Sequence, residues 1–260
     1  MVASRRDVLR AGLVSAGGVL AAGPAWAQAA GPSVGQGVAV PGQDAAQGLS
    51  PVVVELYTSQ GCSSCPPADR MLTQMIDNPQ VLPLSLHVDY WDYLGWKDGL
   101  ADPMFTRRQK AYARAQGSRM VYTPQMVVDG QGFVKGAHEG EVAEEIARAR
   151  LRPKAVRLEV EPAGSGLHHL RALPAPDLAA GPMQVTLVHY LPHKQVEILR
   201  GENAGARIDY VNIVTFWRPV AEWDGRAPLE MLIEPVQDRP AAVLIQRAGL
   251  GPIEAAARLP

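Results

Sequence analysis

Cysteine is the residue that the chain uses most sparingly. Only two occur among 260 residues, at positions 62 and 65. Two thiolates alone do not complete a tetrahedral metal site, because Zn²⁺ sites of this kind take four ligands. Whatever cysteine chemistry the chain performs therefore depends on this one pair, with or without ligands from elsewhere.

A charge excess and long apolar runs are also absent. Lys and Arg number 25 against 26 Asp and Glu, which gives a formal net charge of −1. This balance gives no reason to expect nucleic acid or an anionic membrane as a partner. After residue 27 no apolar run approaches the length that crosses a bilayer. At 47% hydrophobic residues, the chain can bury one large core or two modest ones.

The start of the chain has the pattern of an export signal. A basic stretch at residues 4–10, SRRDVLR, precedes a short apolar run at 11–22, and an A-x-A cleavage site ends at Ala27. The basic stretch resembles a bacterial twin-arginine signal, although an ordinary secretory signal with two arginines has a similar pattern. We expect residues 1–27 to be removed, leaving a periplasmic or secreted protein without a membrane anchor.

The mature chain divides by composition into three parts. Residues 28–49 are rich in Gly, Ala, Gln and Pro and predict a flexible lead-in. Residues 50–152 alternate between strand and helix patterns, in the order strand, helix, strand, helix, strand, strand, helix. The expected segments are 51–57, 66–76, 81–88, 105–116, 120–128, 131–134 and 139–150. An Asp-Gly pair at 129–130 predicts a hairpin between the last two strands.

Residues 153–260 have a different pattern. Short apolar runs alternate with Pro, Gly, Asn and Asp, and helical periodicity is almost missing. The expected strands are 156–160, 168–173, 184–191, 196–199, 208–217, 229–233 and 242–245. This pattern of short strands and turns is typical of a β-sandwich or a similar antiparallel domain. The predicted architecture is an α/β domain at 50–152 followed by an all-β, sandwich-like domain at 153–260.

The cysteine pair lies between the first strand and the first helix. At the start of a helix, unpaired N–H groups and the positive end of the helix dipole favour a thiolate at Cys62. Cys65, one turn further along, is placed to attack a mixed disulfide formed by Cys62. This chemistry needs one exposed and one shielded sulfur. Farther along the chain, Thr123-Pro124 lies inside a strand pattern, and a cis peptide bond there would explain a proline that cannot join the ladder.

Several motifs together resemble a known family. Residues 51–150 look like a thioredoxin-like domain, with Cys62 and Cys65 as its dithiol and Thr123-Pro124 as its cis-proline motif. More closely, the stretches YTSQGCSSCPPAD, HVDYWDYLGWKD, RQKAYA, VYTPQMVVDG and GENAG resemble a family of uncharacterised secreted thioredoxin-like proteins. By analogy with the buried acid of thioredoxin, Glu55 is a candidate proton acceptor for Cys65. The alternative for Glu55 is a strand residue without a catalytic role.

Other interpretations of the cysteine pair stay open at this stage. A structural disulfide across so short a loop would add only about 1–2 kcal/mol by chain entropy. Zn²⁺ or Cu⁺ would need two further ligands, and His87 is the histidine nearest the pair along the predicted fold. The aromatic run at 90–96 either lines a client groove or packs the insertion, and GENAG at 201–205 has the composition of a tight turn.

These observations predict a periplasmic thiol–disulfide oxidoreductase. The expected site comprises Cys62, Cys65, Thr123, Pro124 and Glu55, with a protein or small-thiol redox partner and no bound cofactor or metal. The alternative is a non-catalytic binding module that holds a protein partner or copper. The sequence does not name the partner of the β-rich region.

Overall fold

The computed structural model describes residues 50–236 and 239–260. The expected export signal and lead-in, at 1–49, lie outside these residues. The elements are β1 (Val52–Thr58), α1 (Pro66–Thr73), β2 (Val81–His87), the short 3₁₀ helix η1 (Asp92–Leu94), α2 (Pro103–Ala115), β3 (Gln125–Val128), β4 (Gly132–Lys135), α3 (Glu139–Leu151), β5 (Val156–Gly164), β6 (Leu167–Pro174), β7 (Met183–Glu197), β8 (Arg207–Trp223), β9 (Leu229–Ile233), β10 (Ala241–Arg247) and β11 (Ile253–Arg258). No helix in this part of the chain is long and apolar enough to cross a membrane.

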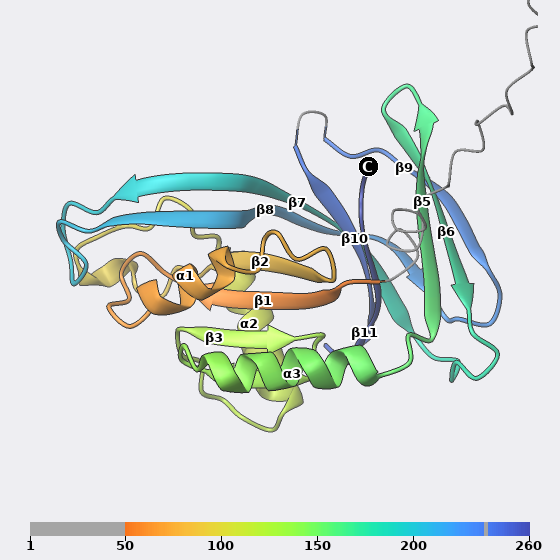
Figure 1. The fold of residues 1–260 in the computed structure, drawn as a ribbon, viewed down its shortest axis with the longest axis horizontal. Helices are drawn as coiled ribbons and strands as arrows, with labels where there is room; N and C mark the ends of the chain where they lie inside the picture. Colours follow the sequence, from red (N-terminus) through yellow and green to blue (C-terminus); the bar gives the residue numbers. More distant parts are fainter. Residues whose placement is uncertain (1–49, 237–238) are drawn as a thin grey trace, which may run out of the picture. The chain divides into compact units, whose positions relative to one another are not determined.

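One large sheet connects the two halves of the chain. Its eight strands follow the order β11-β10-β7-β8-β2-β1-β3-β4 (Figure 1). β1 lies parallel to β2 and antiparallel to β3, and β3 and β4 form the hairpin expected around Asp129 and Gly130. The junction between the halves is a parallel contact of β2 with β8, where Ser85 faces Ile213. A second sheet contains β5, β6 and β9.

The predicted fold class, an α/β thioredoxin-like domain followed by an all-β (sandwich-like) domain, is wrong. The described chain is mostly β, with a mixed eight-stranded sheet, a three-stranded sheet and three short α-helices. The physical reason is the β2–β8 contact, because it lets the long hairpin of β7 and β8 extend the sheet of β1–β4. Strands on both sides of residue 152 therefore belong to one sheet.

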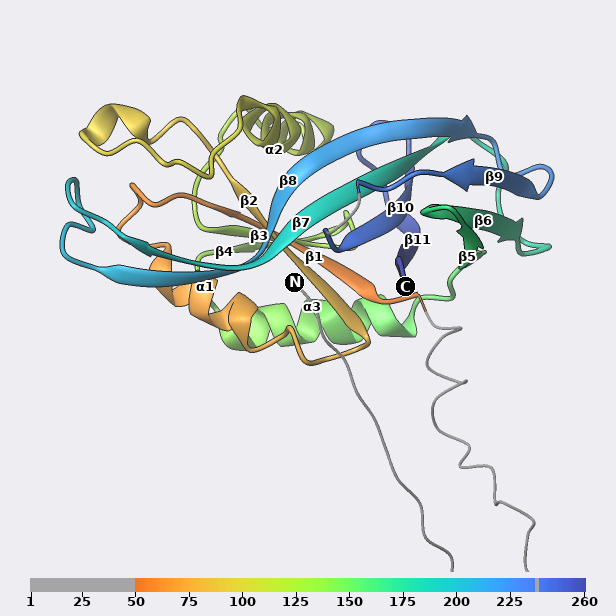
Figure 2. The same ribbon diagram turned by 90° about the horizontal axis from the view of Figure 1, so that it is seen from above.

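The faces of this sheet place the elements that surround the cysteines. All residues of β1 and β2 are buried, as expected for strands covered on both sides. Figure 2 shows α2 on one face of these strands and α1 with α3 on the other. Side chains alternate along β1, so Val53, Glu55 and Tyr57 face the α2 side. Val52, Val54, Leu56 and Thr58 face the α1 side.

A third core lies between the three-stranded sheet and the C-terminal strands of the large sheet. It joins Leu170 and Ile233 of the small sheet to Leu187 and Val243 of the large one. β7 contains the expected strand 184–191 and continues into the first two residues of the separately expected strand 196–199. β11 was not predicted, because its sequence IEAAAR has little β-branched character.

Candidate functional site

The two cysteines form a disulfide between the end of β1 and the start of α1. The Cα atoms of Cys62 and Cys65 are 5.4 Å apart. Both residues are buried, with 1% and 0% of their surfaces exposed, whereas Ser63 and Ser64 between them are exposed. The expectation of one exposed sulfur is therefore wrong for this state. Cys62 is held under its own loop, with its Sγ 3.4 Å from the hydroxyl of Ser64.

The start of α1 offers the cysteine sulfurs fewer backbone N–H donors than the sequence suggested. Cys65 is the N-cap residue of α1, and Pro66 and Pro67, which follow it, have no N–H. The next two amides, of Ala68 and Asp69, both donate to the carbonyl of Cys65. The first four helical residues therefore leave no free N–H for a Cys62 thiolate, and only the dipole of a short helix remains to favour it.

Thr123 and Pro124 lie beside the cysteine loop. Their peptide bond is cis, as the sequence suggested. The Thr123 carbonyl oxygen is 3.5 Å from the Ser64 hydroxyl, and the Thr123 hydroxyl accepts a hydrogen bond from the Trp91 indole N–H at 2.7 Å. The structure thus places the cis Thr123-Pro124 segment beside Ser64, which stands between the two cysteines.

Glu55 lies on the other face of β1. Its carboxylate is fully buried and accepts two hydrogen bonds from Arg108, at 2.7 and 2.8 Å, with one from each of Tyr57 and Tyr112. The Arg108 guanidinium also packs over the Trp217 ring, 4.0 Å from its centroid. Because both carboxylate oxygens are engaged on the α2 side, the structure does not bring Glu55 to the disulfide. It ties α2 to the sheet instead.

A second group of buried polar residues lies on the α1 side, beneath the cysteine loop. Asp69 comes from α1 and His87 from the end of β2, directly opposite Thr58 of β1. Asp98, from the loop before α2, accepts from His87 Nδ1 at 2.8 Å and from the Gln60 amide at 2.9 Å. Tyr210 of β8 packs edge-on against the His87 ring, with centroids 4.7 Å apart. The members are Thr58, Asp69, Ser85, His87, Asp98 and Tyr210, and we name them the subsurface polar cluster.

The electrostatics of this cluster are set mainly by burial. Desolvation raises the pKa of Asp69 to about 7, although attraction to His87 opposes the rise. Desolvation also opposes ionisation of Asp98, but His87 and the amides of Gln60 and Leu100 hold its pKa below the ordinary value. Two neighbouring acids are thus pushed in opposite directions. Such separation is common where protons are exchanged.

The place of Asp69 in this cluster does not follow from the sequence motifs above. The residue stands in the stretch CSSCPPAD, where the two cysteines alone predict a chemical role. The helical periodicity of this stretch does indicate that Asp69 is buried, because Asp69 lies on the same helical face as the buried residues Leu72 and Cys65. A carboxylate on an apolar face requires an explanation. His87 was expected only as a possible metal ligand.

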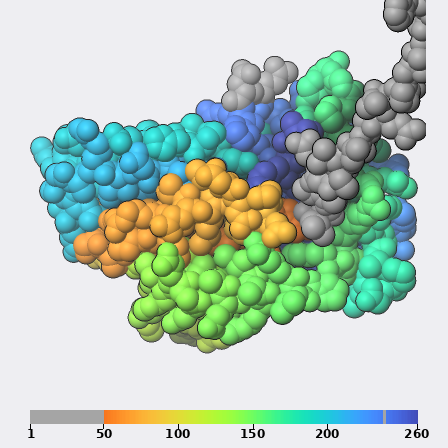
Figure 3. Space-filling model, in the orientation of Figure 1, coloured from red at the N-terminus to blue at the C-terminus, as the bar shows by residue number. Residues whose placement is uncertain are grey.

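Two distant segments hold the cysteine loop from outside. The Trp96 indole donates to the Gln60 side chain at 2.8 Å, and Trp91 lies against Gly61, where an added Cβ would come within 3.2 Å of it. Asn203, in the turn between β7 and β8, donates to the carbonyls of Gln60 and Cys62 at 2.9 and 3.0 Å. Figure 3 shows the surface of the α1 segment, in orange, beside that of β7 and β8, in cyan.

The turn at 201–205 therefore does more than reverse the chain. Its turn character is confirmed by positive φ at Gly201 and Gly205. Through Asn203 it also supports the cysteine loop, a contact that spans about 140 residues of sequence. Local composition predicts the turn, but it does not predict the contact of the turn with the cysteine loop.

We expect Asn203→Ala to loosen the cysteine loop. The variant loses two hydrogen bonds, which corresponds to about 1–3 kcal/mol of unfolding free energy. A small dithiol reductant should open the Cys62–Cys65 disulfide several-fold faster than in the wild type. Urea unfolding and the reduction rate are the measurements, with Glu202→Ala, an exposed neighbour, as the matched control. Equal reduction rates in all three proteins would show that the turn does not protect the disulfide.

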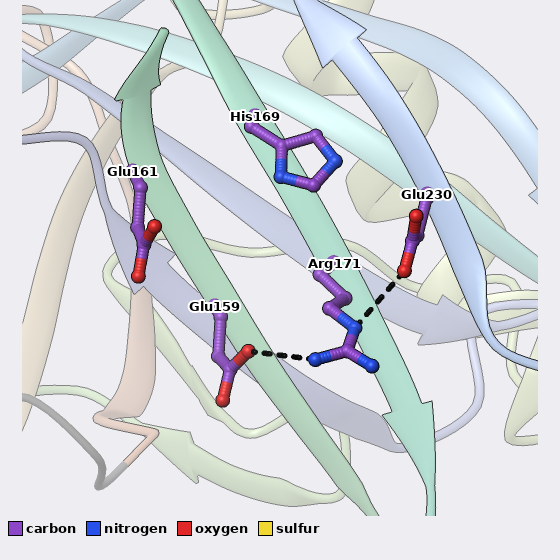
Figure 4. Close-up of a pocket in the computed structure, with 5 residues that line it drawn as sticks. All are labelled: Glu159, Glu161, His169, Arg171 and Glu230. Atoms are coloured by element: carbon purple, nitrogen blue, oxygen red, sulfur yellow. Dashed lines mark ion pairs between the residues drawn. The ribbon is translucent and has the colours of Figure 1, made fainter.

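Elsewhere the surface of the described residues has open hollows. One, of about 230 Å³, lies on the small sheet and is lined by Glu159, Glu161, His169, Arg171 and Glu230 (Figure 4). Arg171 pairs with Glu230 at 3.0 Å and with Glu159 at 3.9 Å. These pairs are solvent-exposed and contribute little to stability. Among the described residues, no group of three or more His, Cys, Asp or Glu side chains is arranged to hold a metal ion.

Fold and site together define a mostly β protein with a buried disulfide between a central strand and a short helix. The chain belongs to the family described as "Protein of unknown function (DUF1223)", whose model matches residues 53–246. The family assignment expected from the motifs is confirmed at this level, as a family without an assigned function. A search of curated proteins found no match.

Two solved structures are similar to this one. A protein of Agrobacterium tumefaciens, determined by X-ray crystallography in a structural genomics programme, is 32% identical with a TM-score of 0.70. The match covers 82% of this chain and 95% of that protein. HBP35 of Porphyromonas gingivalis is 13% identical with a TM-score of 0.57, over 81% of this chain and 74% of its own. At this identity, the second match concerns the fold alone.

Proposed function

We propose that this protein exchanges disulfides with protein or small-thiol clients through Cys62 and Cys65. The observation that carries the proposal is the disulfide itself, closed across two residues between β1 and α1 by the only cysteines of the chain. A loop this short gains only about 2 kcal/mol from chain entropy, so stabilisation alone is a weak reason for it. Two cysteines separated by two residues are the usual centre of disulfide oxidoreductases.

The proposed reaction balances without a bound cofactor. A client thiolate attacks Cys62 Sγ, the Cys62–Cys65 bond breaks, and Cys65 leaves as a thiolate that takes up a proton. A second client thiolate then attacks the client sulfur of the mixed disulfide, and Cys62 leaves. The client has lost two electrons and two protons, and the protein has gained them. A disulfide oxidant restores the starting state, and the reverse sequence reduces a client disulfide.

Cys62 is the proposed point of attack because fewer packed residues surround it than surround Cys65. The neighbouring Ser63 and Ser64 are exposed, whereas Cys65 is the N-cap residue of a packed helix. With 1% of Cys62 exposed, a client gains access when the cysteine loop moves away from Trp91 or from the turn at 201–205. We place this reaction in the periplasm or outside the cell, where an oxidising environment favours the disulfide form.

A trapping experiment tests this proposal. Cys65→Ala is exported to the periplasm, where it should accumulate mixed disulfides through Cys62 because no resolving thiol remains. Partners are identified by mass spectrometry after reductive release. Cys62→Ser and the double variant Cys62→Ser/Cys65→Ala are the controls and should trap nothing. Folded, exported Cys65→Ala that forms no mixed disulfide would overturn the proposal, as would trapping by Cys62→Ser equal to that of Cys65→Ala.

The burial of both sulfurs favours a second candidate, a non-catalytic module that holds a protein partner or copper through its β-rich region. Binding of this kind needs no free thiol at the surface. It requires that complexes form equally well after both thiols have been reduced and alkylated. Isolation of the same partners by alkylated and untreated protein would support it over disulfide exchange.

A further inference from the structure

The position of Asp69 relative to Cys65 is the first observation. The two residues are four apart at the start of α1, and the Asp69 amide donates to the Cys65 carbonyl at 3.1 Å. Residues at i and i+4 of a helix lie on the same face, with Cβ atoms about 5–6 Å apart. Both are buried, at 3% exposure for Asp69 and 0% for Cys65, on the face that packs against the sheet. Asp69 is therefore the acid on the same buried face of α1 as Cys65, one helical turn away.

Each element that faces Asp69 contributes a polar side chain. β1 contributes Thr58, β2 contributes His87, the loop before α2 contributes Asp98, and β8 contributes Tyr210. On its own helix the nearest charge is that of Arg70, which is exposed. Within the described residues, no full positive charge from another element neutralises Asp69, except when His87 is protonated. This arrangement differs from Glu55, which has a fixed guanidinium partner.

Several atoms of the subsurface polar cluster have no hydrogen-bond partner within the described part of the chain. They are Ser85 Oγ, His87 Nε2 and Tyr210 Oη, while the carboxylate of Asp69 has only the Thr58 hydroxyl near it. A buried polar atom without a partner costs about 1–3 kcal/mol, so a protein rarely keeps several in one place. A role in proton exchange during a reaction would be a physical reason for a protein to retain such atoms.

The contact between Asp98 and His87 fixes which nitrogen of the imidazole ring is hydrogen-bonded. Asp98 also accepts two backbone N–H bonds and is held ionised, so the 2.8 Å contact makes His87 Nδ1 the donor. His87 Nε2 is then the ring nitrogen that has no hydrogen-bond partner among the described residues. The subsurface polar cluster therefore contains the hydrogen-bonded pair of Asp98 and His87 and, near it, Asp69, whose carboxylate His87 attracts. Within the pair, Asp98 orients the imidazole in the way a carboxylate orients a catalytic histidine.

We propose that Asp69 accepts the proton of the Cys65 thiol when Cys65 resolves a mixed disulfide, with His87 and Asp98 as positioning residues. The inference rests on the proposed exchange function. In the step, the S–H bond of Cys65 breaks and its proton moves to the Asp69 carboxylate. The Cys65 thiolate attacks Cys62 Sγ, and the Cys62–client bond breaks. The client sulfur leaves with the bonding electron pair and takes a proton from solvent. In the opposite direction Asp69 returns the proton to the leaving Cys65.

The tuning of the two acids supports these roles. A proton acceptor works best when its pKa lies near the working pH, and burial raises the pKa of Asp69 to about 7. Asp98, whose pKa is lowered, is a poor acceptor and a good orienting anion. A buried carboxylate without an ion-pair partner, such as Asp69, lowers stability, which suggests that it has a role other than holding the fold together.

The first test needs no catalytic activity. In reduced Cys62→Ser, the Cys65 thiol is titrated by its thiolate absorbance, with and without Asp69→Asn. Removal of the neighbouring negative charge should lower the pKa of Cys65 by about one unit or more. Asp77→Asn, which removes an exposed carboxylate just beyond α1, is the matched control and should leave the titration unchanged. Coinciding titrations of Cys62→Ser and Cys62→Ser/Asp69→Asn would show that Asp69 is not coupled to Cys65.

The second test measures resolution directly. Reduced protein is mixed with an aromatic disulfide whose thiol is coloured, and release of the second coloured thiol reports the attack by Cys65. Asp69→Asn should slow this step roughly 10²-fold near pH 7 and remove its pH dependence in that region. A lower thiol pKa together with a slower attack is a combination that simple loosening of the site does not produce.

The outcomes separate this inference from the proposed function. If wild type and Asp69→Asn resolve at the same rate and their Cys65 titrations coincide, the proton-acceptor role fails while disulfide exchange stands. If the wild type releases no second thiol, disulfide exchange fails. The titration then still decides whether Asp69 is coupled to Cys65, and an unchanged titration overturns the inference.

Discussion

Arg108→Met is expected to lower the free energy of unfolding by about 3–5 kcal/mol, because it leaves Glu55 buried without its charged partner. Glu55 is fully buried, and Arg108 donates to both of its oxygens. Burial tends to lower the pKa of Arg108, but the adjacent Glu55 raises it above its ordinary value. Arg108 is therefore charged at neutral pH.

The loss extends beyond the ion pair. Arg108 also donates to Tyr112 and to Gln246 of β10, and its guanidinium stacks on Trp217 of β8. One side chain thus connects α2 to three strands. Arg108→Lys retains the charge but cannot reproduce the bidentate contact, so we expect a smaller loss of about 1–3 kcal/mol.

Chemical unfolding in guanidinium chloride at neutral pH measures both variants, with the dependence on denaturant checked for equal slopes. Arg148→Met is the matched control. Its partners Glu144 and Glu145 lie on the exposed face of α3, so the expected loss is below about 1 kcal/mol. In the double variant Glu55→Gln/Arg108→Met, part of the stability should return because no unpaired charge stays buried. A loss below about 1 kcal/mol for Arg108→Met would contradict a structural role for this pair.

Features of the fold that depend on neighbouring residues were predictable from the sequence, and features that depend on distant residues were not. Local patterns gave β1, α1, α3 and the Asp129-Gly130 hairpin, because each depends on neighbouring residues. The fold class was wrong because it depends on Ser85 meeting Ile213, a pairing across 128 residues that no local pattern encodes. The strand-like run before Pro192 likewise continues in one strand, β7, into the start of the run after it.

The candidate site was predictable in part for the same reason. The cysteine pair is a local motif, and the cis Thr123-Pro124 bond was suggested by a proline within a strand pattern. The choice of Glu55 as the acid near the dithiol overlooked the alternation of a strand. Odd-numbered residues of β1 face α2, whereas Thr58 faces the α1 side. The contacts of Asn203 and Asp98 depend on loops that are far away along the chain.

Asp69→Asn should stabilise the protein at neutral and alkaline pH while it impairs the proposed chemistry. In the folded state the pKa of Asp69 is raised from 3.8 to about 7 by burial. Between about pH 4 and 7 the folded protein therefore retains a proton that the unfolded chain has lost. Stability then falls as the pH rises through this range, since the unfolded state binds fewer protons. The shift of about 3 units corresponds to a destabilisation on the order of 4 kcal/mol at pH 8.

Asparagine has nearly the same shape as protonated Asp69 and does not ionise. The two proteins should therefore have similar stability near pH 4, and Asp69→Asn should be the more stable one, by up to about 4 kcal/mol, at pH 8. Urea unfolding of both proteins at several pH values measures the difference, in which the contributions of other titrating groups largely cancel. Asp77→Asn, at an exposed carboxylate, should show no such divergence. A stability difference independent of pH would mean that the pKa of Asp69 is the same in the folded and unfolded states. A difference that grows with pH, with slower resolution by Cys65, would identify Asp69 as a residue kept at the expense of stability, which is the pattern of functional sites.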